Sequence, residues 1–251
     1  MYKLNNFFDN QNMVCINQLG QYRVFEHQKD LSVNPFDAEE AYFSAEMNVK
    51  RRQVLVTLTN TGCKLQAGAM QWMLGNVNMV SGVNAGNFLG KAIGAAVTGE
   101  TMAKPEYTGQ GLLMLEPTYK HILLVDVSKW GSIVLQDGLF LACDQQLQHN
   151  VISRKNLSSA VLGGEGLFNL QLSGQGIAVL ESPVPEQELI MFNLENDVVK
   201  IDGNMAIAWS GSLDFTVEKS SKSLLGSAVS GEGLVNVYRG TGSILMAPTA
   251  K

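Results

Sequence analysis

Three glycine-containing markers recur in the same order three times along the chain, and this recurrence constrains the fold more than any other feature. A Gly-X-Gly triplet begins at Gly109, at Gly174 and at Gly240, which gives a period of about 65 residues. Each triplet precedes a short apolar run and a proline, in the sequences LLMLEP, IAVLESP and SILMAP. A period of this length indicates one supersecondary unit that is used several times.

Two further markers accompany each triplet. A glycine after a β-rich run opens each copy, at Gly68, Gly138 and Gly203. A Gly-Glu pair precedes each triplet by nine or ten residues, at Gly99-Glu100, Gly164-Glu165 and Gly231-Glu232. Alternating runs such as FNLQL and LDFTVE are typical of half-buried strands. Because glycine reaches positive φ at no steric cost, Asp137-Gly138 and Asp202-Gly203 predict hairpins, and the triplets predict a second tight turn.

The sequence therefore predicts an all-β fold, made of three tandem β-sandwich or β-roll repeats in a pseudo-threefold arrangement. The repeats cover about residues 46–117, 118–183 and 184–249, and together they form a single compact domain. Residues 1–45 are predicted to be an N-terminal strand or arm that packs on the sheets or on a neighbouring subunit.

The first copy contains a longer, glycine-rich segment that predicts a short helix or a loop. Four glycines recur there at every fourth position, with apolar residues between them. Glycine costs about 1 kcal/mol relative to alanine inside a helix, so four of them suggest close packing of another backbone. The interaction candidates in this segment are Gly82, Gly86, Phe88, Leu89, Gly90, Ile93 and Gly94.

The composition predicts subunit contacts and argues against nucleic acid. Charged residues make up 16% of the chain and apolar residues 45%. A charged share below about a quarter leaves apolar surface to be covered, which favours a homo-oligomer with a protein partner or a membrane surface beside it. The net charge of −5 disfavours a polyanion. The one basic cluster, Lys50-Arg51-Arg52, is too short for a nucleic-acid stripe and is interpreted as a solvated strand entrance.

No residue constellation predicts catalysis or a cofactor. The three histidines have no ligand partner at metal-binding spacing, and neither a P-loop nor a nucleophile elbow occurs. We therefore expect no catalytic residues, no cofactor and no enzymatic activity. An enzyme with an unrecognised site stays an alternative, which would require converging Asp, Glu or His side chains with perturbed pKa values.

The cysteines and the N-terminus predict a reducing compartment. Cys15, Cys63 and Cys143 are isolated and odd in number, so they predict no disulfide framework and no zinc site. The first residues lack the basic and apolar regions of a secretory signal. We expect a cytoplasmic protein, in solution or at the periphery of a membrane.

One charged position recurs in all three copies. Glu100, Glu165 and Glu232 would converge on a pseudo-threefold axis and bind a hard cation if the copies surround such an axis. The alternative is that each glutamate accepts backbone N–H bonds within its own turn. Both interpretations stay open at this point.

The second and third copies resemble a known family. GLFLACDQQLQHNVISRK with LGGEGLFNLQLSGQGIAVLES, and GNMAIAWSGSLDFTVEK with SGEGLVNVYRGTGSILMAP, resemble a bacterial family related to the altered-inheritance-of-mitochondria protein. The resemblance covers about residues 45–249, although Thr101-Met102-Ala103 replace the bulky apolar residues after Glu100. It implies a fold similar to the tryptophan RNA-binding attenuation protein, repeated three times, with no catalytic residues to transfer. A shared fold does not imply the RNA function.

The function that these features favour is a non-enzymatic, oligomeric β scaffold or interaction protein, peripheral to a membrane or a protein complex. The alternative is a small-ligand or metal-binding module that uses the three repeat-equivalent glutamates.

Overall fold

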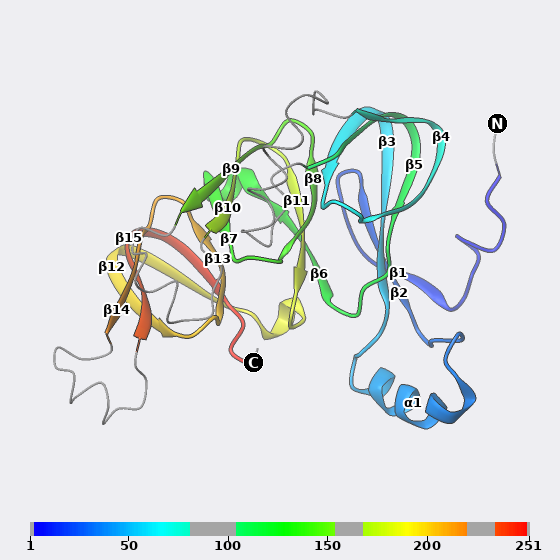
Figure 1. The fold of residues 1–251 in the computed structure, drawn as a ribbon, viewed down its shortest axis with the longest axis horizontal. Helices are drawn as coiled ribbons and strands as arrows, with labels where there is room; N and C mark the ends of the chain where they lie inside the picture. The colour runs from blue at the N-terminus through cyan, green and yellow to red at the C-terminus, as the bar shows by residue number, and fades with distance from the viewer. Residues whose placement is uncertain (1–2, 81–103, 154–167, 220–233, 250–251) are drawn as a thin grey trace, which may run out of the picture.

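A computed structural model of the chain describes residues 3–80, 104–153, 168–219 and 234–249, and these residues form two curled β-sheets (Figure 1). Sheet A has eight strands: β1 (Met13–Leu19), β2 (Tyr22–His27), β3 (Arg52–Leu65), β4 (Met70–Val80), β5 (Glu106–Leu115), β6 (His121–Asp126), β8 (Phe140–Asp144) and β11 (Ile177–Ser182). Sheet B has seven: β7 (Ser132–Leu135), β9 (Gln148–Ser153), β10 (Phe168–Ser173), β12 (Ile190–Asp202), β13 (Ala206–Ser210), β14 (Asp214–Lys219) and β15 (Leu234–Met246). The helical elements are η1 (Pro35–Asp37), α1 (Ala38–Glu46), η3 (Val127–Trp130) and η4 (Glu186–Glu188). The expected all-β class is confirmed.

Residues 52–115, 121–182 and 190–246, which we call the first, second and third units, contain the same succession of elements. A leading strand (β3, β6–β7 or β12) ends at a tight turn, and a middle strand (β4, β8–β9 or β13–β14) follows it. A closing strand (β5, β10–β11 or β15) then pairs with both. Figure 1 shows the units following one another along the long axis.

The glycines of the unit-opening turns were predicted to form hairpins, and this prediction is wrong. Gly138 and Gly203 do have positive φ, at +77° and +54°, so each lies in a tight turn. However, β7 and β8 belong to different sheets, and β12 and β13 pair with opposite sides of β15. The physical reason is that the closing strand inserts between the two strands that the turn joins.

The Gly-X-Gly triplets were predicted to form second tight turns, and this is also wrong. They lie within β5 and β15, and between β10 and β11. No strand reverses there. The strand β15 pairs with β14 before its triplet and with β13 after it, whereas β5 pairs with β3 and β4 on both sides of its triplet. Gly109, Gly174 and Gly240 take φ values of +130°, +110° and +115°, a conformation that favours glycine.

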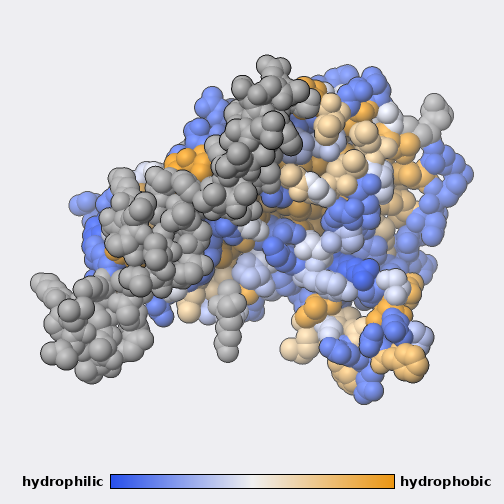
Figure 2. Space-filling model, viewed as in Figure 1, coloured by the Kyte–Doolittle hydropathy of each residue, from blue (hydrophilic) through white to orange (hydrophobic). Residues whose placement is uncertain are grey.

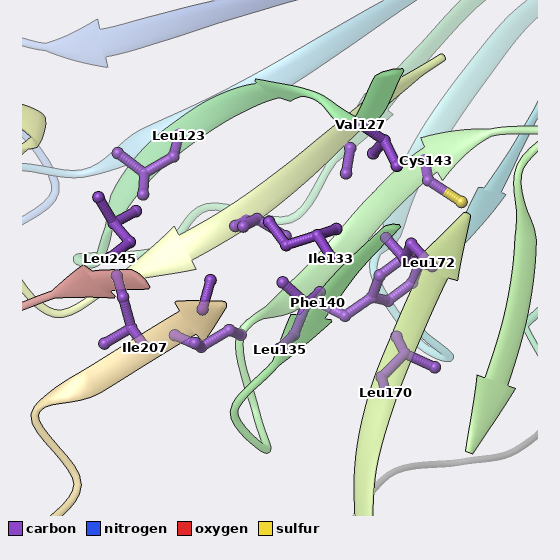
Figure 3. Close-up of a cluster of buried hydrophobic side chains, with 14 of the residues drawn as sticks. Leu123, Val127, Ile133, Leu135, Phe140, Cys143, Leu170, Leu172, Ile207 and Leu245 are labelled. Carbon is purple, nitrogen blue, oxygen red and sulfur yellow. The ribbon is translucent and has the colours of Figure 1, made fainter. Parts of the chain in front are cut away.

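The second unit is divided between the two sheets, and it joins them. Its strands β6, β8 and β11 lie in sheet A, whereas β7, β9 and β10 lie in sheet B. Figure 3 shows the apolar core between them, which reaches from Leu123 in β6 and Phe140 in β8 to Ile207 in β13 and Leu245 in β15. A second cluster joins the first and second units, with Leu65 packed near Ala142. The units therefore share continuous cores.

Residues 1–45 were predicted to be a strand or arm that packs on the sheets or on a neighbouring subunit, and the strands β1 and β2 in this stretch extend sheet A. The strand β2 pairs with β3 over five residue pairs, from Tyr22 opposite Val56 to Glu26 opposite Arg52. Phe7 packs its ring against Trp72 at a centroid distance of 6.0 Å. The helix α1 runs across the proposed boundary at residue 45.

The close approach of β4 and β5 explains the second glycine of the first triplet. A Cβ atom on Gly111 would overlap the carbonyl oxygen of Leu74 and contact Val77. We expect Gly111→Ala to lower the free energy of unfolding by about 2 kcal/mol, measured by urea denaturation. Gly138→Ala is the control, because its Cβ would meet no atom within 4 Å and only the positive φ is unfavourable. An equal or smaller loss for Gly111→Ala would contradict the close approach.

The burial of two cysteines predicts selective alkylation. Cys15 is exposed, whereas Cys63 and Cys143 are buried. Burial is the main reason that the pKa of the Cys143 thiol rises to about 12, so little thiolate forms near neutral pH. We expect iodoacetamide to modify Cys15 alone in the folded protein and all three cysteines in denaturant, measured by mass spectrometry. Rapid modification of Cys143 in the folded protein would contradict this packing.

Candidate functional site

The predicted site residues all lie outside the described residues. This holds for the interaction candidates Gly82, Gly86, Phe88, Leu89, Gly90, Ile93 and Gly94, and for Glu100, Glu165 and Glu232. Among the residues that the structure describes, no group of three or more His, Cys, Asp or Glu side chains could hold a metal ion. No helix within these ranges combines the length and the apolarity that crossing a membrane requires. The predictions on these glycines and glutamates therefore stay predictions.

The helix α1 projects from one end of sheet A (Figure 1). Asn34 begins this segment, because its side chain accepts a hydrogen bond from the Phe36 amide at 3.1 Å, and Pro35 follows at the first helical position. Glu39 and Glu40 lie in the first turn of α1, where their negative charges interact favourably with the positive end of the helix dipole. Asn48 ends it at a φ of +64°, a conformation that asparagine tolerates well.

Large exposed apolar side chains lie on and beside this segment, and none of its helical residues is buried. Phe36 is 95% exposed and Met47 78% exposed. Figure 2 shows this apolar gathering at the lower right, over α1. We call the group the α1 surface, and it consists of Leu31, Phe36, Tyr42, Phe43, Met47 and Val49. Contiguous exposed apolar residues of this kind mark interaction sites on soluble proteins.

A pocket of about 360 Å³ lies between α1 and the end of sheet A. Glu40, Ala41, Ser44 and Ala45 line it from the helix, and residues 27, 28, 30 and 49–51 line it from the opposite side. The small side chains leave a gap under the helix, so α1 lies over the sheet without an interlocking core. Because few apolar contacts attach the helix to the sheet, polar contacts at its two ends hold it in place.

Arg52 makes the strongest of these contacts. Its side chain is only 2% exposed, and it pairs with the Glu26 carboxylate at 2.8 Å. The same guanidinium donates to the side-chain oxygen of Asn48 at 2.7 Å and to its carbonyl oxygen at 3.1 Å. A buried arginine therefore connects the C-terminal end of α1 to strand β2.

Arg51 makes the second contact, with the residues before the helix. It pairs with Asp30 at 2.8 Å, and its Nε donates to the Tyr119 hydroxyl, which in turn donates to Asp30. The Ser32 hydroxyl donates to Asp30 at 2.6 Å and is the main reason that the pKa of this carboxyl lies below its usual range. The bond to Tyr119 likewise raises the pKa of Arg51.

The basic cluster is thus not the solvated strand entrance that its sequence suggested. Lys50 and Arg52 both pair with Glu26, and Arg51 pairs with Asp30. The interpretation was wrong because the two carboxylates lie far away in the sequence and become neighbours only when β2 pairs with β3.

The charge that remains around α1 is negative. Residues 34–48 contain four carboxylates and no lysine or arginine: Asp37, Glu39, Glu40 and Glu46. None of the four is in an ion pair with another described residue. The α1 surface is therefore apolar with an acidic border. The sequence did carry a signal for it, since Phe36, Tyr42 and Phe43 stand inside an acidic stretch instead of in a strand pattern.

The sequence and the fold of this chain are similar to those of known proteins. A family model described as mitochondrial biogenesis AIM24 matches residues 44–249. An uncharacterised protein of Streptococcus pyogenes serotype M6 is 32% identical over 189 residues, which cover 72% of this chain and 74% of that protein. A crystal structure of a Streptococcus pyogenes protein has a TM-score of 0.59 at 25% sequence identity, and the match covers 81% of this chain and 90% of that chain. The family resemblance noted in the sequence is confirmed.

The burial of Arg52 predicts a large effect of its removal. Arg52→Ala would leave the largely buried Glu26 carboxylate with Lys50 as its one ion-pair partner among the described residues and would remove both bonds to Asn48, so we expect the free energy of unfolding to fall by about 3 kcal/mol. The control is Lys120→Ala, because Lys120 is 51% exposed in its pair with Glu181 and its loss should cost less than about 1 kcal/mol. Urea denaturation measures both, and similar losses for the two variants would contradict the role assigned to Arg52.

Proposed function

The chain belongs to the mitochondrial biogenesis AIM24 family, and from this premise we propose that it is a non-enzymatic, oligomeric β scaffold that binds a protein partner through the α1 surface. The observation that carries the proposal is the exposure of six large apolar side chains around one helix. Such a surface is unfavourable in water, and a partner that covers it would gain the free energy of removing it from water.

The charge around α1 indicates the chemistry of the partner. Four carboxylates without a basic neighbour in residues 34–48 complement a segment that is both apolar and basic. An amphipathic helix with lysine or arginine beside its apolar face has this character. The same carboxylates disfavour an anionic lipid surface, which attracts basic residues.

The polar contacts near the pocket support a binding role instead of catalysis. Asp30 is occupied by Arg51, Ser32 and Tyr119, and Glu26 is occupied by Lys50 and Arg52. These two carboxylates hold the helix segment in place, so neither is positioned as a free acid or base. The absence of a cofactor is part of this proposal.

We propose that the three units are repeats of one β unit, because leading, middle and closing strands recur in each. The pseudo-threefold arrangement, the likeness to the tryptophan RNA-binding attenuation protein and a location in the cytoplasm or at a membrane periphery stay predictions. A metal-binding module built on Glu100, Glu165 and Glu232 stays the alternative function, and metal analysis of the purified protein tests it.

A peptide-binding experiment tests the proposed function. The probe is a designed amphipathic peptide of leucine and lysine, and its affinity is measured by fluorescence anisotropy. We expect Phe43→Ser with Met47→Ser to weaken binding about tenfold or more, since interface anchors contribute over about 1 kcal/mol each. Met79→Ser is the matched control, because Met79 is 55% exposed on β4, away from α1.

Three outcomes would overturn the proposal. The first is no binding of the basic peptide, and the second is equal binding by the α1 variants and the wild type. The third is preferential binding of phosphatidylserine vesicles over the peptide, because this would make the partner a membrane surface.

A further inference from the structure

The units are joined by a short backbone ladder that occurs twice. The leading strand of the first unit pairs with the middle strand of the second, with Lys64 opposite Cys143 and Leu65 opposite Ala142. The leading strand of the second unit pairs in the same way with the middle strand of the third, with Val134 opposite Trp209. In each ladder, one strand of a unit pairs with one strand of the next unit.

The hydrogen bonds that flank the two ladders also correspond. At one end, the Gln66 amide donates to the Leu141 carbonyl at 2.8 Å, and the Gln136 amide donates to the Ile207 carbonyl at 3.0 Å. At the other end, the amides of residues 145 and 211 donate to the carbonyls of residues 62 and 132, at 3.1 and 2.9 Å. The junction between units is therefore one repeated contact with a defined register.

Pairing within each unit shows which residues of the third leading strand correspond to this contact. Tyr107 and Tyr238 both stand two residues before the first glycine of their triplets, and they lie opposite Cys63 and Val199. Lys200 is therefore the counterpart of Lys64 and Val134, and Ile201 is the counterpart of Leu65 and Leu135.

The middle strands correspond through a bulge that all three contain. The ladder to the closing strand skips residue 71, 141 or 207. The next residue is Trp72, Ala142 or Ala208, and the one after it is Met73, Cys143 or Trp209. In the first unit, Trp72 and Met73 thus occupy the positions that meet a preceding unit elsewhere in the chain.

The counterpart positions on β12 (Lys200 and Ile201) and on β4 (Trp72 and Met73) have no partner strand on their outer edge within the described residues. There, β12 pairs only with β15, and β4 pairs only with β5. The exposure of the side chains reflects this difference, since Met73 is 46% exposed whereas Cys143 and Trp209 are 0% and 3% exposed. Figure 1 shows β12 and β4 at opposite ends of the molecule.

The free edge of β4 has the character of an interface. The strand β4 is 11 residues long and contains no charged residue, in the sequence MQWMLGNVNMV. Soluble proteins ordinarily protect such an edge with charges, proline or a covering segment, because it can pair with another chain. Phe7 packs against one face of Trp72, but residues 3–12 make no backbone hydrogen bond to β4 in the described structure.

We infer that β12 of one chain pairs with β4 of a second copy of the chain, head to tail, with Lys200 opposite Met73 and Ile201 opposite Trp72. This inference rests on the oligomeric scaffold proposed above and names its contact. The contact repeats the internal junction in the same register, and it replaces the Leu–Ala pairs by an aromatic–β-branched pair, which sheets favour. Because the two surfaces differ, the assembly closes into a ring or continues as a filament.

A charge test examines both the contact and its register. Met73→Lys would place a lysine opposite Lys200, and we expect the dissociation constant of self-association to rise about tenfold or more. Met73→Glu is the matched control, because it adds an equal amount of charge but attracts Lys200. The double variant Met73→Lys with Lys200→Glu should restore association. Sedimentation velocity over a range of concentrations measures all four proteins.

A complementation test separates head-to-tail pairing from symmetric pairing. The internal ladders direct the amides of residues 64 and 143 across the junction, so those of Lys200 and Met73 point outward. Proline there removes an outward donor and is tolerated on an edge strand. We expect Met73→Pro and Lys200→Pro each to be monomeric, and their mixture to form a one-to-one dimer and nothing larger. Circular dichroism and the alkylation pattern of the cysteines confirm that each variant folds.

The outcomes distinguish this inference from the proposed function. A wild-type oligomer that Met73→Lys leaves intact would overturn the inference and leave the scaffold standing. A dimer of Lys200→Pro alone would indicate symmetric β4 pairing and would also overturn it. A wild-type protein that is monomeric at every concentration would overturn both the inference and the oligomeric part of the proposed function.

Discussion

The ladder between the leading strand of one unit and the middle strand of the next is the contact on which the rest of the structure depends. It consists of only three residue pairs at each junction. Its strength comes from burial, because the apolar clusters on both sides continue across the junction from one unit to the next. Backbone groups that are buried must be paired, and here each unit supplies the partners that the next one needs.

The same dependence explains why the two ends of the chain differ from its middle. At the N-terminal end, β1 and β2 extend sheet A beside the first half of β3, and residues near Phe7 cover one face of Trp72. At the other end, β12 has no comparable cover among the described residues. The strands β12 and β4 therefore each keep one edge without a partner strand among the described residues.

The α1 surface depends on a different interaction, the buried pair of Arg52 and Glu26. Burying a charge is costly unless it is paired and hydrogen-bonded, and Arg52 meets this condition through Glu26 and Asn48. The helix is therefore held at its ends while its apolar side chains stay in water. A helix attached in this way can meet a partner without disturbing the cores of the sheets.

The sequence by itself determined the β class, the family and the period of the markers, because strand alternation and glycine at positive φ are local properties of the chain. Only the tertiary structure decided what the markers do. The turn at Gly138 joins two sheets, and the triplet at Gly240 lets β15 exchange partners, because strand pairing is set by residues far away in the sequence. For the same reason, the sequence did not predict the ion-pair partners of Arg51 and Arg52. It also did not predict the free edges of β4 and β12.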